Sequence, residues 1–180
     1  MKTFVAALAA VAICTSPVLA QSVGEKSGIN SALGITPKTE DFVKEAAVSD
    51  MFEIESSRLA TTKGDAATKA FAAQMVTDHT KTSSELKTAV TGNSALQIPT
   101  ALDDSHQSKL DKLKGLSGAD FAKEYRSVQV SAHKSAVSLF KRYADGGEDA
   151  KLKAWAAKTL PALQHHLEMA EALNKQTATN

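Results

Sequence analysis

The chain has 180 residues, of which 43% are hydrophobic and only 5% are aromatic. Its 21 basic and 20 acidic residues give a formal net charge of +1, without a basic patch or an acidic tract, so no nucleic acid is expected as a partner. With 9 glycines and 4 prolines, the composition favours helices that pack through small residues. The length suits one domain.

Residues 1–20 are predicted to be a signal peptide. Lys2 precedes the apolar stretch FVAALAAVAICTSPVLA, which ends in the small-residue cleavage site Val18-Leu19-Ala20. A transmembrane anchor is the less favoured alternative, because residues 15–17 interrupt a short apolar run. We expect cleavage after Ala20, export to the periplasm and no transmembrane segment in the mature chain. The single cysteine, Cys14, lies in this segment, so the mature protein would contain neither disulfides nor thiolate ligands.

Residues 21–35 are polar and contain glycines, and we expect a flexible arm. The pair Thr36-Pro37 then predicts the start of a helix that ends at Gly64. Asp65 is the expected N-cap of a second helix, which ends near Gly92. These two helices form a predicted antiparallel hairpin with a very short turn.

The region from residue 92 to residue 117 is predicted to be a long connection with a short helix at about 103–114. A third long helix follows to about residue 145, and Gly146-Gly147 separates it from a fourth that reaches about residue 174. Residues 36–175 are thus expected to form an all-α, ferritin-like four-helix bundle with a long connection between its second and third helices. Residues 176–180 form a polar tail.

Each long helix offers a histidine or a glutamate toward the expected core. His79 lies near the centre of an apolar face, His133 on the flank of another, and His166 within the apolar seam of the last helix. The first helix has two alternative seams, which place either Glu53 or Glu55 inward. A rise of ~1.5 Å per residue puts these positions in one slab roughly 8 Å thick.

Buried histidines and carboxylates are unfavourable unless they are paired or bound to a metal. Three imidazoles and one carboxylate suit Zn, Cu, Fe or Ni, so a metal site is predicted at Glu53, His79, His133 and His166. The alternative left open is a metal-free polar layer, in which Glu53 pairs with His79, and His133 pairs with a serine or Gln129. Di-iron chemistry is disfavoured because the sequence has no Glu-x-x-His motif.

Several neighbours of these residues are expected to be less important. His165 and His106 are interpreted as surface residues, and Asp78 as a surface group or a support for a ligand. Pro161 removes one helical hydrogen bond from the fourth helix, so it is expected either to tilt His166 inward or only to bend the helix around the core.

Four segments then show a resemblance to a known family: DFVKEAAVSDMFEIESSRLA, KAFAAQMVTDHTKTSSEL, GADFAKEYRSVQVSAHKSAVSLF and LKAWAAKTLPALQHHLEMAEAL. With their motifs M-x-x-D-H, Q-V-x-A-H-K and L-P-x-L-x-x-H-L, they resemble the bacterial domain-of-unknown-function family 4142. That family is ferritin-like in fold and is often labelled "predicted outer membrane protein". The resemblance implies fold and export, without a reaction. It also implies that the family's recurring residues fall on Glu53, Asp78, His79, His133 and His166, with Pro161 in the last motif.

Two hypotheses follow. The first is an exported soluble bundle that binds a metal ion or a small ligand in its core and acts in envelope stress or metal handling. The second is a structural or interaction protein of the envelope, with an envelope protein as its partner and a metal-free polar layer. An enzyme ranks below both, and no catalytic residue is assigned, because the sequence has neither a nucleophile motif nor a phosphate-binding loop.

Overall fold

The computed structural model describes residues 29–176, and the predicted signal peptide lies outside this range. The described residues form six helices and no strand, which confirms the prediction of an all-α protein. The helices are α2 (Ile29–Ala32), α3 (Thr39–Lys63), α4 (Ala66–Val90), α5 (Asp104–Gly115), α6 (Gly118–Gly146) and α7 (Ala150–Lys175).

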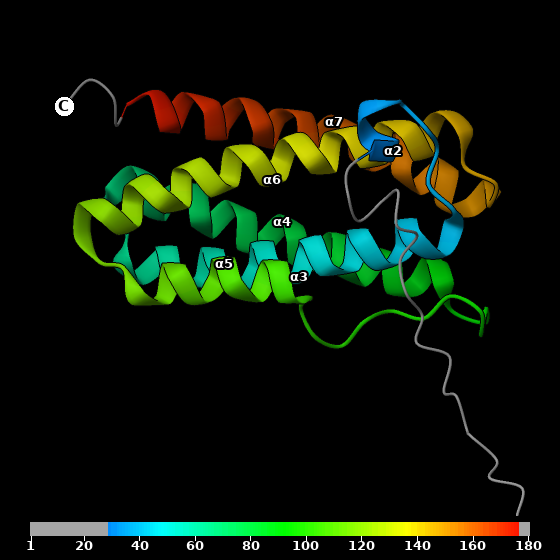
Figure 1. Ribbon diagram of the computed structural model, residues 1–180, viewed down its shortest axis with the longest axis horizontal. Coiled ribbons are helices and arrows are strands. Elements are labelled where there is room, and N and C mark those ends of the chain that lie inside the picture. Colours follow the sequence, from blue (N-terminus) through cyan, green and yellow to red (C-terminus); the bar gives the residue numbers. More distant parts are fainter. Residues whose placement is uncertain (1–28, 177–180) are drawn as a thin grey trace, which may run out of the picture.

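The four long helices α3, α4, α6 and α7 lie side by side along the length of the molecule (Figure 1). α3 packs against α4 and α6 against α7, and the two hairpins meet through α3–α6 and α4–α7 contacts. The connection after α4 runs back along the bundle and includes α5, which packs on α3. α6 therefore begins near the turn between α3 and α4, and it runs in the same direction as α4.

Local sequence signals account for most helix boundaries. The carboxylates of Asp65 and Asp149 accept hydrogen bonds from the backbone N–H groups of Thr68 and Leu152, each at 2.9 Å, and so cap α4 and α7. The predicted start of α3 at Thr36-Pro37 was wrong: α3 begins at Thr39, after an extended residue that makes no side-chain cap. The hydroxyl of Thr36 donates instead to the backbone carbonyl of a residue in α6.

The turn between α3 and α4 requires the glycine that the sequence places there. A Cβ atom at Gly64 would lie 2.8 Å from the carbonyl oxygen of Ala60 and 2.8 Å from Cγ2 of Thr68. Because both distances are shorter than ordinary van der Waals contact, any side chain would push the two helices apart. Gly64 therefore fixes the close approach of α3 to the first turn of α4.

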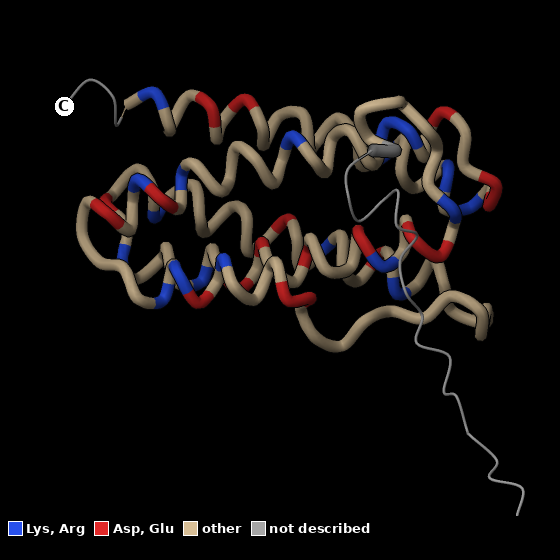
Figure 2. Tube along the Cα trace, viewed as in Figure 1, with Lys and Arg blue, Asp and Glu red and all other residues tan. Residues whose placement is uncertain are grey.

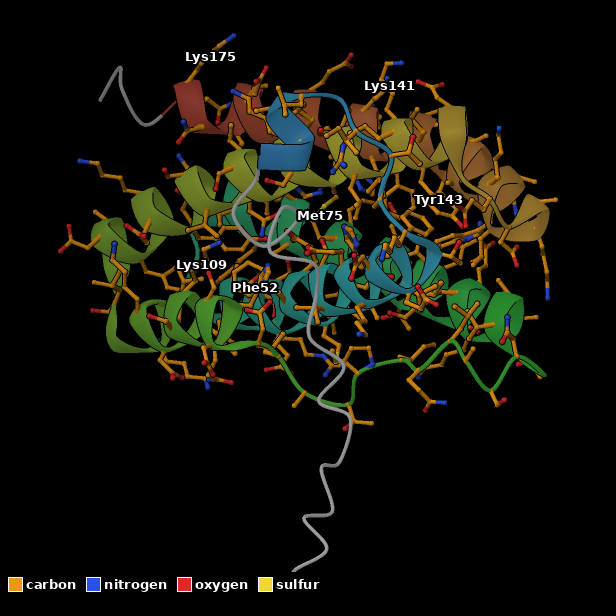
Figure 3. All side chains as sticks on the ribbon, turned by 45° about the vertical axis from the view of Figure 1, so that its right-hand side comes forward. Phe52, Met75, Lys109, Lys141, Tyr143 and Lys175 are labelled. Atoms are coloured by element: carbon orange, nitrogen blue, oxygen red, sulfur yellow. The ribbon has the colours of Figure 1, made fainter. Side chains whose placement is uncertain are left out.

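The hydrophobic core consists of two clusters. One contains Phe42, Phe140, Tyr143 and Trp155, and the other contains Phe52, Phe71, Met75, Phe121 and Tyr125. Figure 3 labels Phe52 and Met75 of the second cluster, and Tyr143 of the first cluster further along the bundle. Along α4, α6 and α7, a buried histidine lies between the residues of the two clusters. A polar layer thus crosses the bundle between two apolar regions.

Positions of Lys, Arg, Asp and Glu are distributed with both signs along the helices (Figure 2). Among the described residues, no helix is long and apolar enough to cross a membrane. The described end of the predicted arm contacts α6, where the hydroxyls of Ser31 and Ser138 are 2.8 Å apart and Nη1 of Arg142 donates to the carbonyl of Ile35 at 2.5 Å.

Candidate metal centre

Three predicted site residues come together in the polar layer. His79 of α4, His133 of α6 and His166 of α7 are only 2%, 1% and 4% exposed. One ring nitrogen of each lies within 4.8 Å of one ring nitrogen of the other two. The three pairs of ring centroids are 5.5–5.6 Å apart. The rings therefore face a common space inside the bundle.

The choice between the two adjacent histidines of α7 follows its apolar seam. Leu163, His166 and Ala170 are buried at helical spacing, whereas His165 lies outside this seam and is exposed. The prediction that His166 points inward is confirmed. Pro161 lies inside α7 on its exposed face, as does Ala157, whose carbonyl loses its helical donor. Solvent can satisfy that carbonyl, which explains how the helix tolerates the proline.

Two aspartates hold the outward nitrogens of two of the rings. Nδ1 of His79 is 2.8 Å from Oδ1 of Asp50, and Nε2 of His166 is 2.9 Å from Oδ2 of Asp78. A carboxylate accepts the N–H, so the other nitrogen of each ring presents its lone pair to the interior. The inward atoms are thus Nε2 of His79 and Nδ1 of His166.

The third ring is held by the backbone. Nδ1 of His133 donates to the carbonyl of Gln129, one turn earlier in α6, at 2.9 Å. Its Nε2 atom then carries the lone pair. Among the described groups, none forms a hydrogen bond with Nε2 of His79, Nε2 of His133 or Nδ1 of His166, although all three atoms are buried. Each imidazole is fixed from outside and unsatisfied inside, as histidines that bind metals usually are.

Glu53 is buried beside the three rings but does not belong to the nitrogen cluster. Its Oε1 atom lies 3.9 Å from Nδ1 of His133, which is the outward nitrogen of that ring. Neither carboxylate oxygen forms a hydrogen bond with a described group. Glu55, the alternative on the same helix, is exposed. The structure therefore places Glu53 beside the ring of His133 and outside the cluster of three nitrogens.

The surroundings shift the pKa values of the buried histidines and of Glu53 in different directions. Burial, and then the charge of His79, lower the pKa of His133 to about 4, and the same two causes lower the pKa of His166 to about 4. Burial alone would lower the pKa of His79, but Asp50 and then Glu53 outweigh burial and raise it. Burial also raises the pKa of Glu53, against the opposing effects of His79 and the amide of Gln129.

These donors fit a transition-metal ion. Bond lengths of about 2.0–2.1 Å to imidazole nitrogen imply nitrogens roughly 3.4 Å apart in a tetrahedral site. The observed upper limit of 4.8 Å lies well below the ~7 Å beyond which three rings could not share an ion. A contraction of at most roughly 1.4 Å would bring the nitrogens into coordination. Neutral imidazole suits Zn, Cu, Fe and Ni better than it suits Mg or Ca.

Sequence reasoning missed Asp50, the main partner of His79. Asp50 is only 6% exposed and also accepts hydrogen bonds from the hydroxyls of Thr82, at 2.8 Å, and Ser83, at 3.3 Å. The expected pairing of Glu53 with His79 is corrected accordingly. Asp50 lies one turn before Glu53 in α3, so the spacing of the two carboxylates contained the signal.

The chain matches a known protein family over most of its length. A family described as "Domain of unknown function (DUF4142)" matches residues 24–173. The chain belongs to the DUF4142 family. Comparisons with curated proteins and with solved structures found no significant match to either. The segment matched to DUF4142 contains the three histidines, Glu53 and both aspartates that hold the rings. The resemblance drawn from the sequence motifs is thereby confirmed.

Proposed function

We propose that this protein binds one divalent transition-metal ion in the core of its bundle, with His79, His133 and His166 as ligands. The observation that carries the proposal is the orientation of the rings. All three outward nitrogens have an acceptor, and all three inward nitrogens are buried without a hydrogen-bond partner among the described groups. An unpaired buried polar atom destabilises a fold by about 1–3 kcal/mol, and a shared ion would satisfy three of them at once.

Glu53 is proposed as the fourth ligand. Its two oxygens are buried without a hydrogen-bond partner among the described groups, and the same ion would coordinate one of them. The two positive charges of a divalent ion would be balanced by the buried carboxylates of Glu53 and Asp50. The filled layer would then carry little net charge, apart from the carboxylate of Asp78 at its partly exposed edge. This balance favours a divalent ion over Cu(I). One site of this kind differs from a di-iron centre, which requires several inward carboxylates.

The proposal also includes the cellular setting. The bundle would be ferritin-like, would be exported to the periplasm, and would act in metal handling or in envelope stress. The predicted signal peptide supports the export, and the histidine site supports the role in metal handling. The order of the helices, with α4 and α6 running in the same direction, supports the ferritin-like arrangement. Cell fractionation and the intact mass of the native protein test the export, which requires a periplasmic chain that begins at Gln21.

Elemental analysis of the mature chain purified from its native compartment is the decisive experiment. We expect about one transition-metal ion per chain, and an apoprotein that regains one equivalent when it is titrated with Zn²⁺ or Co²⁺. His165→Ala is the matched control for His166→Ala, because it removes the adjacent but exposed ring. An apoprotein that binds no ion would support the metal-free polar layer and a structural role in the envelope.

A further inference from the structure

The three acceptors that hold the histidine rings differ in their access to solvent. The side chain of Asp50 is 8% exposed, Gln129 is fully buried, and the side chain of Asp78 is 32% exposed. Asp78 lies at the contact between α4 and α7, where it reaches across to His166. Of these direct partners of the site, Asp78 is thus the one that also faces the surrounding solution.

We propose that the metal ion enters and leaves the site between α4 and α7, with Asp78 as its first contact and His166 as the ligand that moves. This inference rests on the proposed metal site and adds its route of exchange. Asp78 acts as a positioning residue here: it attracts the cation and returns the ring of His166 to its bound orientation.

Asp78 has a carboxylate oxygen available for a cation. Both of its hydrogen bonds, from Nε2 of Gln74 at 2.7 Å and with Nε2 of His166 at 2.9 Å, use Oδ2. Among the described groups, none forms a hydrogen bond or an ion pair with Oδ1. A hydrated ion can bind Oδ1 without breaking the contact that holds the ring. An exposed carboxylate also raises the local concentration of cations and therefore the rate of association.

The other two rings are held more firmly. Asp50 receives two further hydrogen bonds from hydroxyls of α4, so the pair that it forms with His79 is anchored on both sides. Nδ1 of His133 is bound to the backbone of its own helix. Among the described groups, His166 is held by one hydrogen bond, and its acceptor, Asp78, is partly exposed. The layer thus contains two fixed ligands and one that can turn aside.

The test measures the rates at which the apoprotein, as the full mature chain, binds Co²⁺ and loses it to a chelator in stopped-flow absorbance. Asp78→Asn keeps the size of the side chain and removes its charge. We expect it to slow association about tenfold and to weaken the dependence of the rate on salt. Asp78→Glu should restore most of the rate. Asp50→Asn should speed dissociation and lower affinity about 10–100-fold, with association within about twofold of the unmodified protein.

A second pair of variants tests the route without changing any partner of a ligand. Gln74 and Gln107 each donate to an aspartate four residues later, Asp78 and Asp111, at 2.7 and 2.8 Å. Gln74→Lys places a cation beside the proposed first contact, and Gln107→Lys makes the same change on α5. The first should slow cobalt association severalfold, whereas the second should leave it within about twofold, because screening by salt confines the effect to roughly 10 Å.

Each outcome decides between the two proposals. If the unmodified protein binds cobalt but association is equally fast in Asp78→Asn and Gln74→Lys, the route between α4 and α7 is wrong while the metal site stands. Equal slowing by Gln74→Lys and Gln107→Lys would also overturn the route, since the effect would then be one of overall charge. Absence of cobalt binding by the unmodified protein would contradict the metal site itself.

Discussion

The carboxylate of Asp50 and the imidazole of His79 form a buried pair between α3 and α4, with 2.8 Å between Oδ1 and Nδ1. The pair fixes the tautomer of His79, because the nitrogen that donates to Asp50 leaves Nε2 to face the other rings. It also raises the pKa of His79, although burial acts in the opposite direction. One contact thus determines both the direction of the ligand atom and the affinity of the ring for a proton.

The first prediction is that metal affinity falls as pH falls. A raised pKa favours the protonated form, so His79 and Glu53 both retain a proton to higher pH than they ordinarily would, and the ion must displace it. His133 and His166, with pKa values of about 4, are already neutral near pH 7 and contribute little. Affinity should rise up to about tenfold per pH unit for each proton displaced. Zn²⁺ calorimetry in buffers with different ionisation enthalpies measures this release, and zero protons at pH 6 would contradict the prediction.

The second prediction compares the two adjacent histidines of α7. His166→Ala should lower Zn²⁺ affinity by more than the 10–100-fold that is typical when a residue supporting a ligand is changed. His165→Ala should leave affinity within about twofold, because that ring is exposed and lies outside the cluster. Competition with a chromophoric chelator measures both constants. Equal losses in the two variants would mean that His166 is no ligand.

The third prediction is that one substitution raises the stability of the metal-free protein and lowers its affinity for metal. Glu53→Gln should stabilise the metal-free protein by about 1 kcal/mol at neutral pH, because it replaces a buried acidic group, without a hydrogen-bond partner among the described groups, by a permanently neutral group of the same shape. The same change should weaken metal binding. Urea unfolding with and without Zn²⁺ separates the two effects. Destabilisation of the apoprotein would show that the Glu53 carboxylate is already well paired without metal.

The fourth prediction concerns the fold alone. Asp149→Ala removes a helix cap and should lower the free energy of unfolding by about 1 kcal/mol. Asp65→Ala removes an equivalent cap together with an ion pair to Arg126. Its free energy of unfolding should therefore fall by up to about 1 kcal/mol more than that of Asp149→Ala. The extra loss is small because Asp65 is largely exposed to solvent. Urea midpoints of the apoproteins give the comparison. Equal losses of stability in the two variants would mean that the ion pair contributes no net stabilisation.

The sequence was informative where a helix buries a narrow face. Along α7 the seam from Leu152 to Leu173 identified His166 as buried and His165 as exposed, and the structure confirms both. Two short-range signals, Gly64 and the cap at Asp65, also placed a helix boundary correctly. Helical periodicity was sufficient at these positions because each depends on the residues of one helix and its adjacent turn.

The sequence was less informative along α3, which contacts α4, α5 and α6 and is therefore buried on more than one face. A single seam cannot describe such a helix, so Asp50 was overlooked and Glu53 could not be separated from Glu55. Orientation was the second difficulty. Periodicity predicted that His133 lies near the core, but only the structure shows which nitrogen binds the backbone carbonyl of Gln129 and which faces the other rings.

The position of the histidine layer between two apolar clusters also constrains how the helices align. If α7 slipped by one turn against its neighbours, His166 would move about 5.4 Å along the bundle, away from Asp78 and into hydrocarbon. Leucine and alanine side chains would tolerate such a slip, since one apolar contact replaces another. A ring that has lost its acceptor would not, because its N–H would be buried without the carboxylate of Asp78. The layer therefore favours one alignment of the four long helices over its neighbours, whether or not an ion is bound.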